Sequence, residues 1–274
     1  MLFYYLEHAE RSAMSGSAYS QSLGRGLAIL SAFRSGRPLL GVSEIGREIG
    51  LGRSTTHRYV ATLATLGYLQ QDVTTKKYRL GPRVLDLGFS AINSMELREV
   101  AAPHLRRLSD ETGYTVNMAI LDGLDIVYVE RCRSTQAGQR EIDLNLHVGA
   151  RLPAYCTSLG KVLLAWLPPE EQATVLAGVE FTRRGPNTVT SQAALVAELE
   201  RVRAAGFAIN NEELAYGLRS LAAPVLDHEG QAVAAINLAV HSSMVSMEDL
   251  TARLSETVRR AAADISAHLG YRPS

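Results

Sequence analysis

The chain has 274 residues, of which 46% are hydrophobic and 20% charged, and its formal net charge at pH 7 is zero. This composition is typical of a globular protein with about two domains. No apolar run approaches the ~18 residues that a membrane helix needs, which argues against a membrane protein. Two cysteines are too few for a disulfide framework, so we expect a cytoplasmic protein with no membrane partner.

The first twenty residues, 1–20, are expected to form a disordered N-terminal arm. Their apolar start lacks the basic flank of a signal peptide, and residues 12–20 are small and polar. Met14 is an alternative start of translation that the sequence leaves open.

The zero net charge conceals an uneven distribution of charge along the chain. Residues 21–83 carry ten Lys or Arg against three Asp or Glu, a local charge of +7. Residues 84–274 carry seventeen basic against twenty-three acidic side chains, or −6. A basic module joined to an acidic one predicts a polyanionic partner for the first module only. Two unrelated surface compositions are the alternative explanation.

The first predicted helix covers residues 21–34, with Ser22 as its expected N-cap. Residues 35–38 contain glycine and proline and end it. The apolar side chains that recur at helical spacing and form its apolar face are Leu23, Leu27, Leu30 and Phe33.

The next two predicted helices form a helix-turn-helix. Residues 42–50 predict a short helix with Ser43 as its cap, and residues 53–67 predict the helix that follows. Leu51 and Gly52 supply the short glycine-containing turn of this motif. In the last of the three helices, the side chains expected to face inward are Thr56, Tyr59, Val60, Leu63 and Leu66.

A basic hairpin is expected after these helices. Residues 68–72 and 77–80 have strand character and are joined by a Val-Thr-Thr-Lys turn. Lys76 and Lys77 near its tip would face a phosphate backbone as a basic wing. Residues 21–81 are therefore predicted to form a winged helix-turn-helix domain.

The helix over residues 53–67 is predicted to be a DNA-recognition helix. Its polar and basic side chains lie at its start or opposite its apolar face, and the first residues of such a helix reach base edges in the major groove. Arginine bonds guanine bidentately, while serine and threonine serve phosphates or bases. The predicted contacts to a double-stranded DNA operator are Ser22, Arg25, Ser43, Arg53, Ser54, Thr55, His57, Arg58, Lys76 and Lys77.

Residues 82–112 are predicted to be helical with a bend. The part over residues 82–98 is expected to be a linker helix whose apolar stripe needs a partner, and the alternative is that it packs on the domain that follows it. Two apolar stripes support the helices: Leu85, Phe89 and Ile92 before the bend, and Leu97, Ala101, Leu105 and Leu108 after it.

Residues 99–271 are predicted to form an α+β domain with an antiparallel sheet. Apolar alternation around Asp122-Gly123 and around a second turn at residues 227–230 predicts two hairpins. A further strand is expected from the alternating Ile142, Leu144 and Leu146. Helices are expected near residues 157–167, 169–178 and 191–205, with a long one close to the C-terminus.

A candidate anion site lies at the start of the helix that begins near residue 157. Thr157 or Ser158 is expected to cap this helix, and Val162, Leu163 and Leu164 are expected to point inward. Free N–H groups and the positive end of the helix dipole make such a helix start suited to a carboxylate. The sequence therefore predicts that a small organic acid binds here, with no other cofactor.

Short motifs between residues 21 and 81 add to these features: Gln21-Ser22-Leu23, Arg25, Leu27, Ile29-Leu30, Glu44-Ile45, Ser54-Thr55, His57-Arg58, Gly67-Tyr68-Leu69 and Tyr78-Arg79-Leu80-Gly81. Together they resemble the IclR family of bacterial transcriptional regulators. The resemblance covers nearly the whole chain after the first twenty residues. It implies a GAF- or PAS-like effector domain, a linker helix over residues 82–98 that dimerises, and a homodimer or homotetramer.

The same resemblance implies which residues contact the effector. They lie on the loop before the predicted helix at residue 157, near residue 212 and on two later strands. Arg131 and Arg219 are candidates for a second cation that would bind a dicarboxylate. The implied contacts are Tyr155, Cys156, Thr157, Ser158, Leu159, Glu212, Ser220 and Asn237; caps and packed strand residues without a ligand are the alternative.

Three stretches resemble regulators of the protocatechuate and β-ketoadipate branch of aromatic catabolism. They are residues 128–133, 149–158 and 212–220. The resemblance implies protocatechuate, 4-hydroxybenzoate or β-ketoadipate as the effector.

Two other functions are compatible with parts of the sequence. Ser158 and Lys161 match the S-x-x-K spacing of serine acyl-enzymes, although the companion S-D-N and K-T-G motifs are absent. A winged helix that binds protein instead of DNA is the second, against which the charge of +7 argues. Tyr155 stands where a P-loop needs glycine, and the histidines lack metal-ligand spacing.

Overall fold

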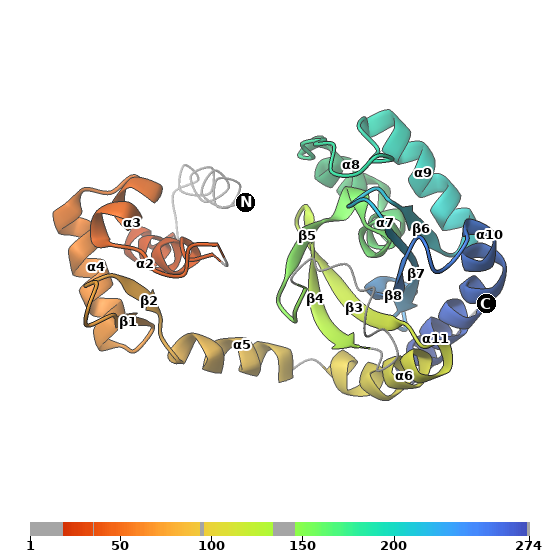
Figure 1. Ribbon diagram of the computed structural model, residues 1–274, viewed down its shortest axis with the longest axis horizontal. Coiled ribbons are helices and arrows are strands. Elements are labelled where there is room, and N and C mark those ends of the chain that lie inside the picture. The colour runs from red at the N-terminus through yellow and green to blue at the C-terminus, as the bar shows by residue number, and fades with distance from the viewer. Residues whose placement is uncertain (1–18, 35, 94–95, 134–145, 273–274) are drawn as a thin grey trace. The chain divides into compact units, whose positions relative to one another are not determined.

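The computed structural model describes residues 19–34, 36–93, 96–133 and 146–272. The chain divides into two compact units, residues 1–94 and residues 95–274, and each is described here by itself (Figure 1). In the described part of the chain, no helix is both long enough and apolar enough to cross a bilayer.

The first unit is a winged helix-turn-helix, as the sequence predicts. Its core consists of side chains from all three helices, the hairpin and the connecting segment at Leu40, and Ile29, Ile45 and Val60 are fully buried in it. The backbone of Leu40 also exchanges two hydrogen bonds with that of Tyr78 on the hairpin. The elements are α2 Gln21–Ser31, α3 Val42–Glu48, α4 Arg53–Thr65, β1 Leu69–Gln71, β2 Tyr78–Leu80 and α5 Arg83–Asn93.

Both predicted serine caps in this unit are wrong. Helix α2 is capped by Ser20, whose hydroxyl accepts a hydrogen bond from the Leu23 N–H at 3.4 Å, and Ser22 lies inside the first turn. Helix α3 starts one residue before Ser43, and the Glu44 carboxylate accepts the N–H of the preceding Gly41 at 2.7 Å. A carboxylate three residues into a helix thus replaces a hydroxyl at its start.

The predicted apolar face of α2 is also wrong in part. Leu23 and Leu27 are 64% and 55% exposed, and the side chains that enter the core are Ala28, Ile29 and Ala32. The buried face is therefore rotated away from the larger leucines. Leu66, predicted to face inward at the end of α4, is 53% exposed.

The second unit is built on a six-stranded antiparallel sheet with the strand order β5-β4-β3-β8-β7-β6. Two predicted hairpins form its centre, and their inner strands pair with Asn117 opposite Asn237. The short strands β5 and β6 were not predicted. The strands are β3 Thr115–Asp122, β4 Asp125–Cys132, β5 Arg151–Pro153, β6 Ala208–Asn211, β7 Leu218–Leu226 and β8 Ala232–His241.

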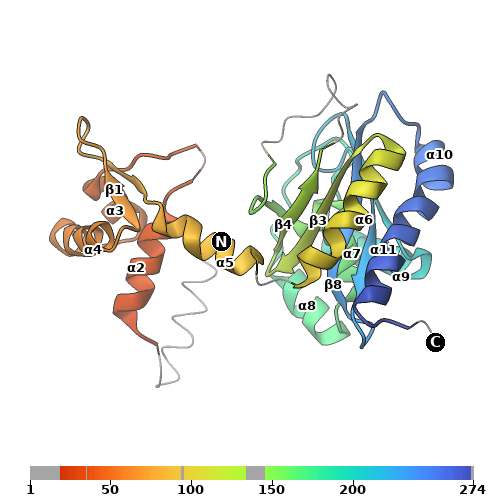
Figure 2. The ribbon, with the colours of Figure 1, turned by 90° about the horizontal axis from the view of Figure 1, so that it is seen from below.

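Helices cover both faces of this sheet, each over its own apolar core. One face packs against α6 (Glu96–Thr112) and α11 (Ser255–His268), which lie side by side in Figure 2. The other face packs against α7 (Ser158–Trp166), which is followed by α8 (Pro169–Ala177) and α9 (Gln192–Ala205). Before α11 come a short helix α10 (Met247–Asp249) and a π-helical segment η2 (Leu250–Leu254). This is the predicted α+β architecture.

The segment predicted to be helical with a bend contains two helices, α5 and α6. Residues 94–95 between them lie outside the described part of the chain, so the predicted bend cannot be compared with the structure. The second apolar stripe packs within its own domain, where Ala101, Leu105 and Leu108 are buried. On α5, Leu85 is 60% exposed, while the side chains of residues 89–93 lie outside the description.

The strand predicted around residues 142–146 cannot be compared with the structure. Ile142 and Leu144 lie outside the described residues, and Leu146 itself has no strand conformation.

Candidate functional site

The start of α4 is held to the preceding turn by one buried threonine. The Thr56 hydroxyl is fully buried and donates to the backbone carbonyls of Gly52 and Leu51, at 3.0 and 3.4 Å. A side chain at Gly46 would approach the Leu51 carbonyl to 2.8 Å, so the close approach of α3 to this turn requires glycine. These contacts fix the direction in which α4 leaves the turn. They therefore fix the side of α4 that faces solvent.

The predicted DNA contacts on α4 lie on its outer side. Arg53, Ser54, His57 and Arg58 are exposed, and Thr55 is half-buried. Arg53, Ser54 and Thr55 follow directly on the N-cap Gly52. At this end of a helix, the free N–H groups and the helix dipole favour anions.

Tyr59 joins α2 to this surface. As the sequence predicts, the half-buried Tyr59 side chain packs against the core of the first unit, while its hydroxyl meets Ser22 and Arg25 of α2. A hydrogen bond with Ser22, followed by the Arg25 guanidinium, lowers the pKa of the Tyr59 phenol below its usual value. The Arg58 guanidinium lies 6.0 Å from the centre of the same ring. Two predicted DNA contacts on α2 are thus brought beside α4.

The two lysines of the wing that are predicted to contact DNA have different surroundings. The Lys77 ammonium lies 3.0 Å from the Glu44 carboxylate, so it ties the wing to α3. Lys76 is exposed and adopts a positive φ of 58° at the hairpin turn. Ser43 is exposed on α3. Lys76 is therefore the cleaner candidate for a contact to phosphate.

In the second unit, helix α7 begins inside the protein. Thr157 is its N-cap and accepts the Gly160 N–H at 3.0 Å. Its backbone carbonyl accepts the Lys161 N–H at 2.9 Å. The N–H groups of Ser158 and Leu159 have no acceptor among the described residues, although both residues are fully buried. Two donors at a buried helix start are thus available to a ligand.

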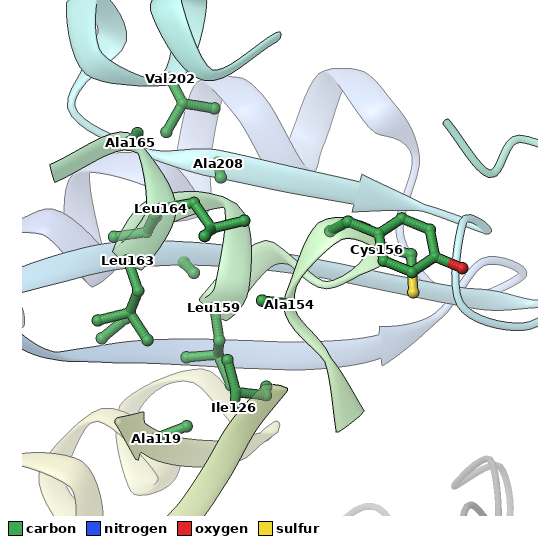
Figure 3. Packing of buried hydrophobic residues seen from close by; sticks show 14 of the residues in the cluster. Ala119, Ile126, Ala154, Cys156, Leu159, Leu163, Leu164, Ala165, Val202 and Ala208 are labelled. Atoms are coloured by element: carbon green, nitrogen blue, oxygen red, sulfur yellow. The ribbon is translucent and has the colours of Figure 1, made fainter. Parts of the chain in front are cut away.

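A glycine makes this arrangement possible. A side chain at Gly160 would overlap the backbone of Ala154, in the 3₁₀ turn that precedes the helix. The turn therefore lies directly against α7. Figure 3 shows Leu159 reaching from α7 toward Ile126 of β4, with Ala154 beside it. Leu159 and Ala154 thus pack against Ile126 and form the apolar surroundings of the helix start.

Polar side chains from β6 and β7 meet this helix start. The hydroxyls of Ser158 and Ser220 are 2.7 Å apart, and both side chains are buried. Asn210, which pairs with Ser220 across the two strands, donates its amide to the Cys156 carbonyl at 2.6 Å. The sequence analysis missed Asn210, since a polar residue on an unpredicted four-residue strand gives no local signal.

A second polar row lies on the same face of the sheet. The Asn117 amide donates to the Asn237 side-chain oxygen at 2.8 Å, and the Arg131 guanidinium donates to the Asn117 oxygen at 3.1 Å. Asn117 is paired with both other residues across neighbouring strands, so the three side chains project to one face. Ala119 on the same strand and face belongs to the core that packs on α7. Asn117 is a second residue that the sequence analysis missed.

Arg219, the other candidate cation, has a structural role instead. It neighbours Ser220 along β7, so it projects to the opposite face. Its guanidinium donates to the Asn211 side chain and to the carbonyls of Ser242 and Val245, at 2.9, 3.1 and 2.7 Å. It therefore holds the loop after β8 and does not face the α7 start.

Three further predicted residues have partners within the protein. The Tyr155 hydroxyl donates to the Thr182 carbonyl at 2.6 Å, and its ring packs against Phe181. Burial raises the pKa of the Cys156 thiol to about 12, so the thiol is neutral at pH 7. Glu212 is only half-buried and accepts the Gly217 N–H at 3.0 Å. The buried acid of this loop is its neighbour Glu213.

The contacts of Lys161 argue against a serine acyl-enzyme. Its ammonium lies 2.6 Å from Glu213 and 3.3 Å from Glu198, so these two carboxylates are its partners. The Ser158 hydroxyl is paired with Ser220 instead, so the serine and the lysine do not form the hydrogen-bonded nucleophile and base of an acyl-enzyme. Among the residues that the structure describes, no group of three His, Cys, Asp or Glu side chains is placed to hold a metal ion.

Two cavities, of about 560 and 200 Å³, lie on the opposite side of the sheet from α7. They are lined by exposed charged residues of α6, η2 and α11, among them Glu111, Arg253 and Arg260. The chemistry favours the α7 start over these two cavities, because in the described part of the chain the α7 start combines buried donors with convergent polar groups.

Comparison with known proteins agrees with both units. Residues 22–73 match the IclR helix-turn-helix domain, and residues 89–267 match the bacterial transcriptional regulator IclR C-terminal domain. The chain belongs to the IclR family. It is a DNA-binding transcriptional regulator, and its named relatives are regulators, not enzymes.

Two curated relatives are each 36% identical to this chain over 251 residues. One is the HTH-type transcriptional regulator XynR of Escherichia coli, where the match covers 92% of this chain and 98% of the relative. The other is the Pca regulon regulatory protein of Pseudomonas putida, with 92% and 84% covered. The similarity to the Pca regulator supports the predicted subgroup.

A solved IclR homologue from Microbacterium hydrocarbonoxydans, in complex with 4-hydroxybenzoate, is 29% identical to the chain. It superposes with a TM-score of 0.77 over 91% of this chain and 99% of the homologue.

The Ser158–Ser220 hydrogen bond gives a stability prediction. Ser158→Ala or Ser220→Ala alone leaves one buried hydroxyl without its partner, so we expect each to lower the free energy of unfolding by about 1–3 kcal/mol. The double variant removes both hydroxyls and should cost less than the sum of the two. Urea denaturation of all four proteins measures this, and strictly additive losses would contradict the hydrogen bond.

Proposed function

We propose that this regulator binds a near-palindromic operator as a dimer or tetramer and is controlled by a small aromatic acid. The observation that carries the effector assignment is the buried start of α7. Two backbone donors there face no acceptor of the described chain, beside the Ser158–Ser220 hydroxyl pair. Donors fixed in this way bind a carboxylate without a charged side chain.

The second polar row, formed by Asn117, Asn237 and Arg131, supplies partners for the other end of the proposed ligand. Asn117 and Ser220 lie two strands apart, across β8, and their registers on β8 differ by two residues. Their Cα atoms are therefore roughly 12 Å apart. A benzoate ring with polar groups at opposite ends fits between them with one hydrogen bond at each end. Arg131, next to Asn117, supplies a cation for a phenolate or a second carboxylate.

The relatives support an aromatic acid. The Pca regulon protein is named for a regulon, and the Microbacterium homologue was solved with 4-hydroxybenzoate. Protocatechuate and 4-hydroxybenzoate are therefore the first candidates, and β-ketoadipate tests whether a flexible dicarboxylate serves as well.

A thermal-shift panel tests the effector. An acid present at 100 times its dissociation constant should stabilise the chain by roughly 2.7 kcal/mol. We expect a shift with protocatechuate or 4-hydroxybenzoate that Ser220→Ala reduces. Benzoate lacks the second polar group and serves as the control. If all the acids leave the midpoint unchanged at millimolar concentration, the proposed effector class is wrong.

For DNA binding, we propose that the outer side of α4 reads bases and the wing binds phosphate. The exposed Arg58 lies beyond the helix start on the same outer side as Arg53 and Ser54, and Arg25 with Ser22 extends this basic surface onto α2. The local charge of +7 in residues 21–83 supplies the attraction to a polyanion.

Two substitutions separate the proposed roles on DNA. Arg58→Ala should cost about 1–3 kcal/mol of operator binding and relax the sequence preference. Lys76→Ala should weaken binding to all DNA sequences alike and reduce the slope of log affinity against log salt concentration by about 1. Arg253→Ala, at an exposed arginine of the second unit, is the control. Fluorescence anisotropy against the chain's own upstream region, at several salt concentrations, gives both quantities. Unchanged operator affinity in Arg58→Ala would remove it from the interface.

We further propose that exposed leucines of the first unit join two copies of the chain. Leu23 and Leu27 on α2, and Leu85 and Leu87 on α5, are each more than half exposed. Single exposed leucines are ordinary, but Leu23 and Leu27 lie one turn apart on α2, and with Leu85 or Leu87 on α5 they offer apolar side chains that a second copy can cover. A two-fold dimer also places two α4 helices on the two halves of a palindrome.

Sedimentation velocity tests this interface. The wild-type chain should sediment as a dimer or larger at micromolar concentration, and Leu27→Glu or Leu85→Glu should shift it toward the monomer. Val73→Glu, at an 81% exposed residue of the wing turn, introduces the same charge and should leave the assembly intact. A wild-type monomer under these conditions would refute the proposed assembly.

A further inference from the structure

Lys161 is a fully buried charged residue that the proposed effector contacts do not include. Its side chain is 1% exposed and is one of the largest fully buried side chains in the described chain. Its ammonium lies 2.6 Å from the Glu213 Oε1 atom and 3.3 Å from the Glu198 Oε1 atom. Burying a charge is costly, and removing one partner of a buried pair leaves the other charge uncompensated.

Glu213 is an unusual partner for this lysine. It is 7% exposed, and its Oε2 atom has no hydrogen-bond partner among the described residues. Burial raises the pKa of its carboxyl, and the nearby Lys161 ammonium opposes the rise. A carboxylate with one oxygen unused is an expensive group to bury, so a stability argument alone does not account for its position.

The backbone of Glu213 leads to the proposed effector site. Its N–H donates to the Asn210 side-chain oxygen at 3.2 Å, and the Asn210 amide donates to the Cys156 carbonyl at 2.6 Å. Cys156 directly precedes the N-cap Thr157. A continuous chain of contacts therefore runs from Lys161 on α7 through the loop after β6 and back to the start of the same helix.

The backbone carbonyl of Glu213 is also held. It accepts the Thr188 hydroxyl at 2.6 Å, and the same hydroxyl accepts the N–H groups of Arg184 and Gly185. A side chain at Gly185 would overlap the Glu212 carbonyl, so these two segments lie in direct contact. The loop that carries Glu213 is thus fixed on two sides.

Glu198 offers a natural comparison. It contacts the same ammonium, but it lies on α9 and its other hydrogen bonds go to Arg201, whose side chain is 73% exposed. It makes no hydrogen bond to the loop before α7. The two carboxylates therefore share a cation but differ in their connection to the α7 start.

We propose that Glu213, anchored by Lys161, is a positioning residue of the effector site. It holds Asn210 so that the Cys156 carbonyl is fixed and the free N–H groups of Ser158 and Leu159 are presented in one direction. The inference rests on the proposed role of the α7 start in binding the effector. It also explains the S-x-x-K spacing: the lysine three residues after Ser158 serves the helix start by position and not by proton transfer.

The test compares Glu213→Ala with Glu198→Ala in the full-length chain. Each variant removes one carboxylate from the same ammonium, but only the first removes the side-chain tie between Lys161 and the loop whose Glu213 N–H holds Asn210. Hydrogen exchange of the peptide covering residues 154–163, measured without ligand, should be faster in Glu213→Ala than in Glu198→Ala. Glu213→Gln, which keeps the side-chain volume, replaces Glu213→Ala if that variant does not fold.

Effector affinity gives the second measurement. By calorimetry with 4-hydroxybenzoate and protocatechuate, Glu213→Ala should lose at least about tenfold in affinity and Glu198→Ala less than about threefold. Asn210→Ala should lose as much as Glu213→Ala, and the double variant should lose no more than either single one. Operator affinity without effector should stay within about threefold of wild type in all four variants.

The outcomes distinguish the two proposals. If wild type binds neither acid, or if Ser220→Ala binds as wild type does, the effector site at α7 is wrong and the positioning role falls with it. If wild type binds and Ser220→Ala does not, but Glu213→Ala and Glu198→Ala behave alike in exchange and affinity, the effector site stands and the positioning role is wrong. Additive losses in the Asn210→Ala/Glu213→Ala double variant would also overturn the positioning role.

Discussion

A helix that begins inside a protein must find acceptors for its first N–H groups, and this requirement organises the second unit. Helix α7 is buried from Ser158 to Ala165, so water does not satisfy its start. The threonine cap takes one donor, and two remain beside a pair of serine hydroxyls. The sheet, the 3₁₀ turn at residues 154–156 and the loop after β6 all place polar groups around this point. A site with unsatisfied donors and fixed walls is suited to a small anion that supplies the missing acceptors.

The two faces of the sheet differ in their side chains. The face toward α6 and α11 is covered by an apolar core that includes Val116, Met118 and Ile236. The face toward α7 interrupts its core with Asn117, Asn237 and Ser220. Strand periodicity makes this division possible, because neighbouring residues along a strand project to opposite faces. One layer therefore stabilises the domain while the other carries the polar groups that the proposed ligand needs.

The recognition helix and the α7 start belong to different compact units. In the proposed function, α4 binds DNA and the α7 start binds the effector. A ligand at α7 would then act on DNA binding through the proposed assembly, that is, through the relation of one α4 helix to its counterpart in the other protomer. The exposed leucines of α2 and α5 are the candidate surface for that assembly. The basic residues of α4 contribute to DNA affinity, and the assembly would set the spacing of the two α4 helices.

The sequence by itself determined the winged helix-turn-helix, both central hairpins and a helix start capped by Thr157 or Ser158, because periodicity, turn residues and capping residues are local signals. It did not determine which side of α2 faces the core: Ile29 displaced Leu23 and Leu27, since burial depends on the packing of α3 and α4 against it. It did predict that Tyr59 faces inward, but not that its hydroxyl meets Ser22 and Arg25 of α2. Asn117, Asn210 and Glu213 joined the site only in the tertiary structure, because residues about 40 to 55 positions from the α7 start meet it only through strand pairing and a loop contact. The roles of Arg131 and Arg219 were likewise separated by the face of the sheet on which each strand places its side chain.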